Sequence, residues 1–143
     1  MFFKMAEKWL NVPFRPHGRD KNGCDCIGLV IGILYENKIM SDEQFNRINS
    51  IRYGSNLSKI NYNLIDKELI VFFEKVEKIQ SADLLLIKCK NSPIHFAIYS
   101  QKNNKTGQII HVIQQNEKVC KTNFDKKLNV ISKYKLRKQY NLS

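Results

Sequence analysis

Apolar residues repeat with a helical period in the first half of the chain and alternate as in strands in the second half. The helical spacing predicts three helices, over residues 2–10, 26–35 and 64–78. After residue 79 the period changes, and short apolar runs bounded by polar turns predict strands. These runs are residues 83–89, 94–100, 108–114 and 130–136, with a short additional strand near Val119.

The order of these elements predicts an α+β fold, with N-terminal helices followed by a C-terminal antiparallel β-sheet. Consecutive strands joined by short turns favour antiparallel pairing. Residues 36–63 are mostly polar and predict irregular structure with one short helix. Because the chain has 143 residues and shows no repeat or linker, we expect a single domain over residues 1–143.

Composition narrows the class of protein. The net charge is +11, but 19 of the 24 basic residues are lysines scattered along the chain, with no block of five or six. Without clustered cations or an aromatic platform, we expect no nucleic-acid partner. No apolar run approaches the roughly 20 residues of a membrane span. The N-terminus lacks the apolar run of a signal peptide, so we expect synthesis in the cytoplasm and delivery to any external target by another route.

One cysteine occupies a position suited to chemistry. A turn-rich stretch, residues 13–25, runs directly into the apolar helix that starts at Cys26. Unpaired N–H groups and the macrodipole at a helix N-terminus stabilise an anion, so we expect a lowered pKa for Cys26. The same groups can hold an oxyanion. Cys24 lies further out on the loop, and we expect Cys89 and Cys120 to be packing residues.

Two histidines lie on strands that a hairpin would bring together. Alternation puts His95 on one face with Ala97 and Tyr99. If the hairpin closes symmetrically about Asn103, His95 pairs directly with His111, and the imidazoles come within hydrogen-bonding reach. With Cys26, the pair would form a nucleophile, a base and an orienting group. A simple buried histidine pair is the alternative, and His17 fits a surface loop.

The residues 23–30, Gly-Cys-Asp-Cys-Ile-Gly-Leu-Val, resemble the nucleophile motif of the NlpC-type cell-wall peptidases, a papain-like superfamily. Residues 9–15 resemble its upstream segment, and residues 81–86 the start of the strand that precedes the catalytic histidine. Residues 94–99 and 110–112 resemble the two strands that carry the histidine and the third residue. The match spans roughly residues 6–137 and looks most like the branch encoded by phages and gene-transfer agents.

The resemblance implies a papain-like fold and hydrolysis of an amide in the peptidoglycan stem peptide through a thioester, without metal or other cofactor. Carried over by position, Cys26 is the nucleophile, His95 the base and His111 the orienting residue. Asp25 matches an acidic residue that contacts the free amine of a stem peptide in some members. The resemblance also implies a phage tail or tail-like particle as the carrier.

Two departures from the family pattern put the cleavage position in doubt. Phe14 stands where the family often has Tyr, and Ile27 where it often has Ser, so polar substrate-binding groups are replaced by apolar ones. We still expect Phe14 and Arg15 to lie at the substrate site. Arg15, Arg19 and Lys21 flank the site in sequence and either meet wall carboxylates or simply solvate the loop.

Two alternatives stay open from the sequence. Cys24, Cys26, His95 and His111 are ligand types that suit zinc, although a single residue between two cysteine ligands is unusual. The same fold could also serve as a catalytically silent module for wall binding or tail assembly.

Overall fold

The computed structural model describes residues 2–51, 59–88, 94–124 and 129–140. The α-helices are α1 (Phe2–Glu7), α2 (Cys26–Glu36), α3 (Asp42–Asn49) and α4 (Lys59–Leu69). The strands are β1 (Arg19–Asp20), β2 (Gly23–Cys24), β3 (Phe73–Lys75), β4 (Leu84–Lys88), β5 (Ile94–Gln101), β6 (Gly107–His111), β7 (Cys120–Asn123) and β8 (Asn129–Leu136). Short 3₁₀ turns are η1 (Ile79–Ser81), η2 (Gln114–Asn116) and η3 (Lys138–Tyr140).

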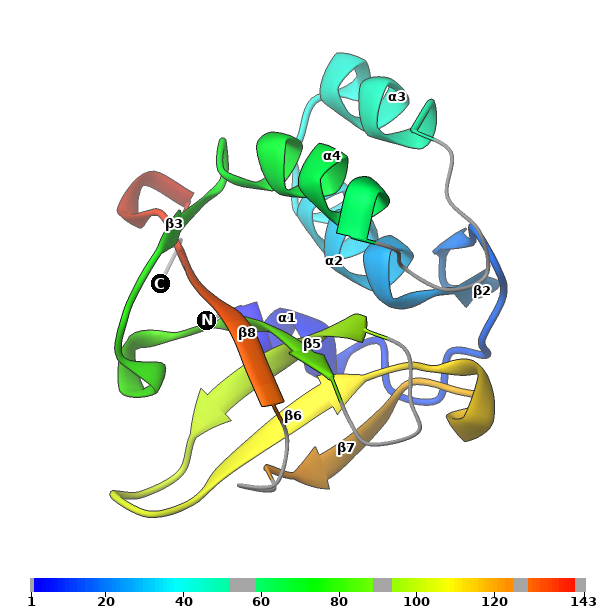
Figure 1. Ribbon diagram of the computed structural model, residues 1–143. Helices are drawn as coiled ribbons and strands as arrows, with labels where there is room; N and C mark the ends of the chain where they lie inside the picture. The colour runs from blue at the N-terminus through cyan, green and yellow to red at the C-terminus, as the bar shows by residue number, and fades with distance from the viewer. Residues whose placement is uncertain (1, 52–58, 89–93, 125–128, 141–143) are drawn as a thin grey trace.

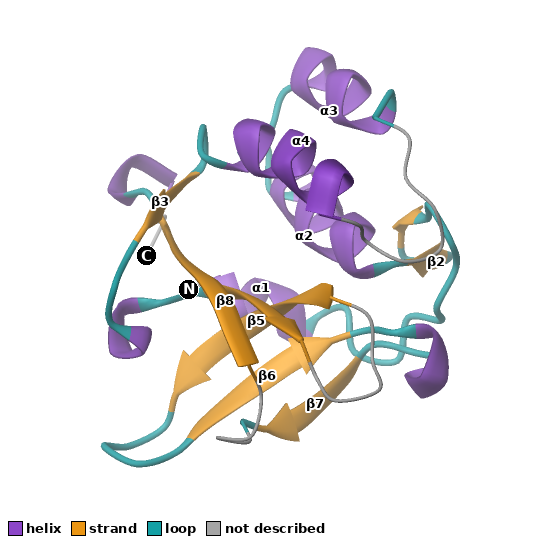
Figure 2. Ribbon diagram, viewed as in Figure 1, coloured by secondary structure: helices purple, strands orange, loops and turns teal. Residues whose placement is uncertain are grey.

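The second half of the chain forms an antiparallel sheet, as predicted. Across the described residues its strand order is β3-β8-β4-β5-β6-β7, and every pairing is antiparallel. Helices α2, α3 and α4 gather on one side of it (Figures 1 and 2). The α+β class with helices first and an antiparallel sheet afterwards is therefore confirmed. Within the described part of the chain, no helix has both the length and the apolarity to cross a membrane.

The sheet buries apolar side chains on both faces. Phe96 and Ile98 of β5 belong to the main core, which the helices cover. Ala97 and Tyr99 alternate with them and belong to a smaller cluster on the opposite face, together with Ile109 of β6. The alternation predicted for β5 is thus observed, and it separates the strand into a helix-facing and an outer side.

Helix α2 is the central element of the main core. Its segment from residue 27 to residue 34 is buried throughout, which explains why the sequence shows an almost unbroken apolar run there. Helix α1 ends at Glu7 rather than Leu10, because residues 8–11 form turns stabilised by backbone bonds such as Trp9 N–H to the Ala6 carbonyl. The indole of Trp9 is buried and donates to Glu36 at 2.7 Å, which ties this turn to the end of α2.

The helix predicted over residues 64–78 is wrong in its second half. Helix α4 ends at Leu69, the chain turns, and β3 then pairs with β8 through Phe73 opposite Leu136. Leu69 and Phe73 are buried in the main core, so the apolar spacing was real. Pairing with β8 overrides the local helical pattern because the chain gains ladder hydrogen bonds while burying the same side chains.

Candidate active site

Cys26 is the first residue of α2, as the sequence predicts. The thiol packs beside the main core, and the backbone N–H groups of Phe96 and Ile27 bond to its sulfur. Phe96 directly follows His95 in β5, and its nitrogen is bonded to the His95 carbonyl carbon. The sulfur therefore lies within a few ångströms of the His95 backbone. In this way α2 and β5 bring together two residues that are 69 positions apart in sequence.

Asp25 caps α2 and anchors the loop in front of it. Its Oδ1 accepts from the Gly28 N–H at 2.7 Å and from Nη1 of Arg19 at 3.0 Å. Its Oδ2 accepts from the His17 N–H at 2.9 Å. The two side chains of the Arg19–Asp25 ion pair are only 9% and 10% exposed. The carboxylate next to the thiol is thus held by three donors, and the loop that precedes Cys26 is fixed by it.

The glycines of this loop are needed for close backbone contact. A Cβ on Gly28 would lie 1.7 Å from the Gly18 carbonyl oxygen, and a Cβ on Gly18 would lie 2.2 Å from the Gly23 carbonyl oxygen. Real Cβ atoms do not approach backbone oxygen so closely, and neither partner is the end of a flexible side chain. Gly18 and Gly28 are therefore required for the close packing of the loop against the first turn of α2.

The pKa of Cys26 is shifted in the direction opposite to the one that its position at a helix N-terminus predicts. Burial of the thiol and, to a smaller extent, the charge of the neighbouring Asp25 carboxylate raise its pKa to about 12. The N–H groups of Phe96 and Ile27, together with Arg19, act in the opposite direction but do not outweigh burial. The expectation of a lowered pKa is wrong because desolvation dominates over the helix N-terminus. At neutral pH the resting sulfur is a thiol, so a base has to take its proton before it can attack.

The two strand histidines meet, though not in the predicted register. Ile98 pairs with Ile110, so the hairpin is centred on Asn104 rather than Asn103. His95 and His111 are consequently diagonal neighbours instead of a direct pair. They share a face, and Nε2 of His95 lies 3.1 Å from Nδ1 of His111. The rings are nearly parallel, with an interplanar angle of 18° and centroids 5.3 Å apart.

His111 is arranged to remain neutral. Burial and, to a smaller extent, the charge of neighbouring His95 lower its pKa to about 4. Its other ring nitrogen, Nε2, lies 3.4 Å from Oγ1 of Thr122 in β7. A neutral imidazole held at both nitrogens can fix the ring and the tautomer of a neighbouring histidine, which is the role expected of an orienting residue.

The other predicted substrate residues lie in the loop that precedes α2. Phe14 is half-buried against the main core and forms a bridge with Cys24, two residues before the thiol. Arg15 is exposed and its N–H bonds to the Cys24 carbonyl. These contacts place both residues beside Cys24, two positions before the thiol, and their contact with substrate stays a prediction. His17 lies in the loop with a positive φ of 59°.

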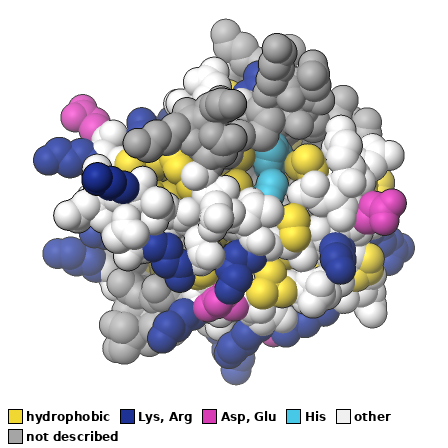
Figure 3. All heavy atoms as spheres, turned by 90° about the horizontal axis from the view of Figure 1, so that it is seen from below, with side chains coloured by type: hydrophobic (Ala, Val, Ile, Leu, Met, Phe, Trp, Pro, Cys, Tyr) yellow, Lys and Arg dark blue, Asp and Glu magenta, His cyan; other side chains and the backbone are white. Residues whose placement is uncertain are grey.

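The basic residues near the site differ in burial: Lys21 lies at the surface and Arg19 is buried. Lys21 pairs with Glu36 at the surface, at 3.0 Å. Arg19 neither solvates the loop nor faces outward, because its guanidinium is buried against Asp25 and also donates to Asn49 Oδ1 at 2.8 Å. Lysines and arginines are spread over the face drawn in Figure 3, where a histidine side chain reaches the surface between apolar groups.

Of the cysteines that the structure describes, neither Cys24 nor Cys120 is grouped with the histidines in a metal site. Cys24 is fully buried in β2, and Cys120 is partly exposed and accepts from Nδ2 of Asn116 at 3.3 Å. Cys89 lies outside the described residues. Among residues 2–51, 59–88, 94–124 and 129–140, no three His, Cys, Asp or Glu side chains are grouped so that they could hold a metal ion. The geometry gives the zinc alternative no support.

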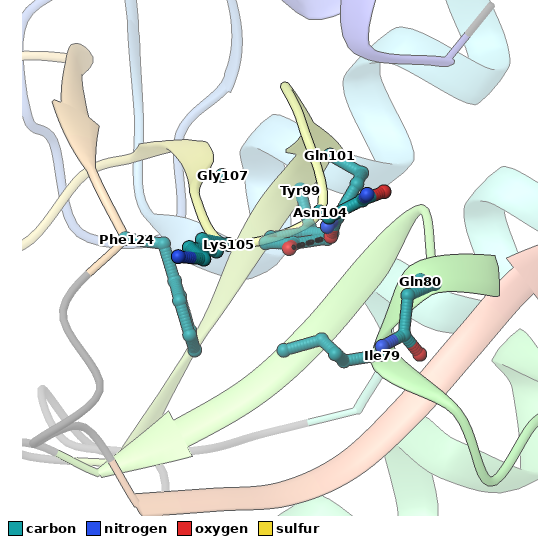
Figure 4. Close-up of a pocket in the computed structure, with 8 residues that line it drawn as sticks. All are labelled: Ile79, Gln80, Tyr99, Gln101, Asn104, Lys105, Gly107 and Phe124. Carbon is teal, nitrogen blue, oxygen red and sulfur yellow. Dashed lines mark hydrogen bonds between the residues drawn. The ribbon is translucent and has the colours of Figure 1, made fainter.

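A separate recess of about 330 Å³ lies further along β5, on the face that carries the outer cluster (Figure 4). It is lined by Ile79, Gln80, Tyr99, Gln101, Asn104, Lys105, Gly107 and Phe124. Tyr99 donates to Gln101 at 2.5 Å within it. None of Cys26, His95 and His111 lines this recess, so it is distinct from the cluster of thiol and imidazoles.

The sequence indicates neither the contact that Arg19 makes nor the role of Thr122. Arg19 precedes Asp25 by six positions, and only the folded loop turns its side chain back onto the carboxylate. Thr122 lies in the short strand expected near Val119, but its contact with His111 depends on the register of β7 against β6. No local signal marks either residue.

Comparisons with known proteins identify the fold. No protein-family model matches the chain, and no curated protein matches it in sequence. Among solved structures, the chain is similar to the NlpC/p60 domain of the peptidoglycan hydrolase SagA, with 19% identity, 85% of each chain covered and a TM-score of 0.52. At this identity the likeness concerns the fold: the chain has the papain-like architecture of an NlpC/p60 domain, with its helices packed on an antiparallel sheet.

Proposed function

We propose that the protein is a cysteine peptidase that hydrolyses amide bonds in the stem peptide of peptidoglycan. The observation that carries this proposal is the meeting of Cys26 at the start of α2 with β5 next to His95, whose Nε2 is engaged by His111 at 3.1 Å. The NlpC/p60 fold of a peptidoglycan hydrolase supports the choice of substrate. Asp25, Phe14 and Arg15 are proposed to contact the stem peptide near the thiol.

The proposed reaction begins with transfer of the thiol proton from Cys26 to Nδ1 of His95, since Nε2 faces His111. The sulfur attacks the scissile carbonyl, and the resulting oxyanion is stabilised by the backbone N–H of Cys26 at the helix start. The tetrahedral intermediate collapses to a thioester as protonated His95 gives its proton to the leaving amine. Water, deprotonated by His95, then hydrolyses the thioester and restores the thiol.

The raised pKa of Cys26 makes the base essential to this scheme. A thiol whose pKa is about 12 contributes almost no thiolate at neutral pH, so attack has to be coupled to proton transfer. The same observation favours a second candidate, a wall-binding module in which the thiol is inert. The phage-tail or tail-like-particle setting belongs to the proposal and follows from the resemblance of residues 23–30 to that branch.

Digestion of purified peptidoglycan, with mass spectrometry of the released muropeptides, tests the proposal. The native protein should release peptides with a new carboxyl and a new amine, and Cys26→Ala should release none while keeping the native circular dichroism spectrum. Cys120→Ser is the matched control, because it removes another partly exposed thiol. Undiminished release by Cys26→Ala would overturn the mechanism. Wall binding without any release by the native protein would favour the silent module.

A further inference from the structure

The side chains behind the proposed base form a chain of three polar groups that ends in a hydroxyl. Nε2 of His95 meets Nδ1 of His111 at 3.1 Å, and Nε2 of His111 meets Oγ1 of Thr122 at 3.4 Å. Catalytic histidines are commonly oriented by a carboxylate or an amide. Here the outermost group is a threonine hydroxyl, which can either accept or donate a hydrogen bond.

The sheet places these groups on one face. In the β6–β7 ladder, His111 is opposite Cys120, and Ile109 is opposite Thr122. Thr122 is therefore the diagonal neighbour of His111, within reach for a side chain of its size. Among the described residues, the titratable groups that face His111 from adjoining strands are His95 from β5 and Cys120 from β7.

The direction of the hydrogen bonds between His95, His111 and Thr122 decides whether His95 can act as a base. Neutral His111 carries one ring proton. If that proton is on Nε2, it is donated to Thr122, and Nδ1 accepts from the N–H of His95, which leaves Nδ1 of His95 as an acceptor. If the proton is on Nδ1, it is donated to His95, whose own proton must then sit on Nδ1. Only the first arrangement lets His95 take the proton of Cys26.

We propose that Thr122 is a positioning residue that accepts a hydrogen bond from Nε2–H of His111 and thereby keeps His95 in the tautomer able to deprotonate Cys26. The kinetic consequence rests on the proposed peptidase function. The tautomer of His111 does not, because it is a property of the resting protein. Thr122 itself touches neither the sulfur nor the substrate in this scheme and acts through His111.

The test uses Thr122→Val, which keeps the shape and removes the hydroxyl, and Thr122→Ser, which restores it. In the resting full-length protein, ¹⁵N NMR of the histidine rings should show the Nε2–H tautomer of His111. Thr122→Val should shift its population toward Nδ1–H, and Thr122→Ser should return it. For wall hydrolysis, Thr122→Val should lower kcat roughly five- to tenfold, the loss of one hydrogen bond, with KM little changed.

Thr106→Val is the matched control, since Thr106 lies in the exposed hairpin loop between β5 and β6. It should leave both the tautomer and the pH–rate profile unchanged, whereas Thr122→Val should shift the ascending limb of that profile. An Nδ1–H tautomer in the native protein, or a Thr122→Val protein with native tautomer and rate, would overturn the proposal. If no form of the protein hydrolyses walls, the NMR result still decides the role of Thr122.

Discussion

Replacing Asp25 by asparagine should weaken the fold and at the same time make the Cys26 thiol more acidic. Asparagine keeps the size of the side chain and one oxygen, so the cap on the Gly28 N–H can survive. It removes the charge that pairs with Arg19, and its amide N–H group would face the His17 N–H, a second donor. The two effects have opposite signs in two different measurements, which makes this substitution informative.

The size of the stability loss follows from burial. Breaking a buried ion pair by removing one partner costs roughly 3–5 kcal/mol, because the other charge is left uncompensated. The Arg19 and Asp25 side chains are 9% and 10% exposed, so this range applies to them, and Asn49 still accepts from Arg19 and limits the loss. We expect about 3 kcal/mol. With a urea m-value of about 2 kcal/mol/M, the unfolding midpoint should fall by about 1.5 M.

The change at the thiol follows from the sign of the Asp25 charge. Asp25 is the second largest cause, after burial, of the raised pKa of Cys26. Removing it should therefore lower that pKa, so that carbamidomethylation of Cys26 by iodoacetamide begins at lower pH. The rate at Cys26 is followed by peptide mass spectrometry over a pH series, which separates it from the other cysteines.

Glu7→Gln is the matched control for Asp25→Asn. Glu7 pairs with Lys121 at 3.1 Å, but the two side chains are 38% and 34% exposed, so the same chemical change should cost at most about 1 kcal/mol. It should leave the reactivity of Cys26 unchanged. If Asp25→Asn destabilised the protein no more than Glu7→Gln did, or if its Cys26 reacted only at higher pH, the account of the loop would be refuted.

Two further predictions concern stability alone. Burial lowers the pKa of His111 from 6.5 to about 4, so the unfolded chain binds this proton first. Stability should be full above about pH 6.5 and fall by up to about 3 kcal/mol as the pH drops toward 4. Urea titrations across this range should show that the unfolding free energy of His111→Gln changes less with pH than that of the native protein. An equal pH dependence in both proteins would contradict the assignment to His111. Gly28→Ala should destabilise the protein by about 1–3 kcal/mol, measured as a lower urea midpoint, because the added carbon meets the Gly18 carbonyl. The higher helix propensity of alanine acts in the opposite direction, by about 1 kcal/mol. A stabilised variant would contradict the close contact.

The sequence predicted the elements whose burial leaves a clear period. Helix α2 was placed within a residue because nearly every side chain from Ile27 to Leu34 enters the core. The strands β4 and β5 are predictable for the same reason, since most of their side chains are buried. The segment after Leu69 could not be predicted locally, because its apolar positions fit a helix and a strand equally well. Its conformation was decided by β8, which lies some 60 residues further along the chain.

The sequence predicts which residues meet at the site, but not the strand register that sets the distances between them. Alternation put His95 on the same face as His111, as their 3.1 Å contact shows. The polar hairpin loop carries no signal for its exact centre, and the register differs from the predicted one because the hairpin is centred one residue later. The diagonal geometry that results still permits the 3.1 Å contact with His111, since diagonal neighbours in a sheet are within reach of ring side chains. The burial of Arg19 against Asp25 could not be predicted, because a charged residue in a loop carries no sequence signal of burial.

The acidity of Cys26 shows why a local rule can give the wrong sign. The helix start and the N–H groups of Phe96 and Ile27 all favour a thiolate, yet burial and Asp25 outweigh them. A standing thiolate would need little help from the histidines, and its rate would depend weakly on their tautomer. A thiol with a pKa of about 12 depends on them fully, because each attack requires a proton transfer to His95. The same burial that makes Cys26 inert at rest thus gives His111 and Thr122 their importance in the proposed reaction.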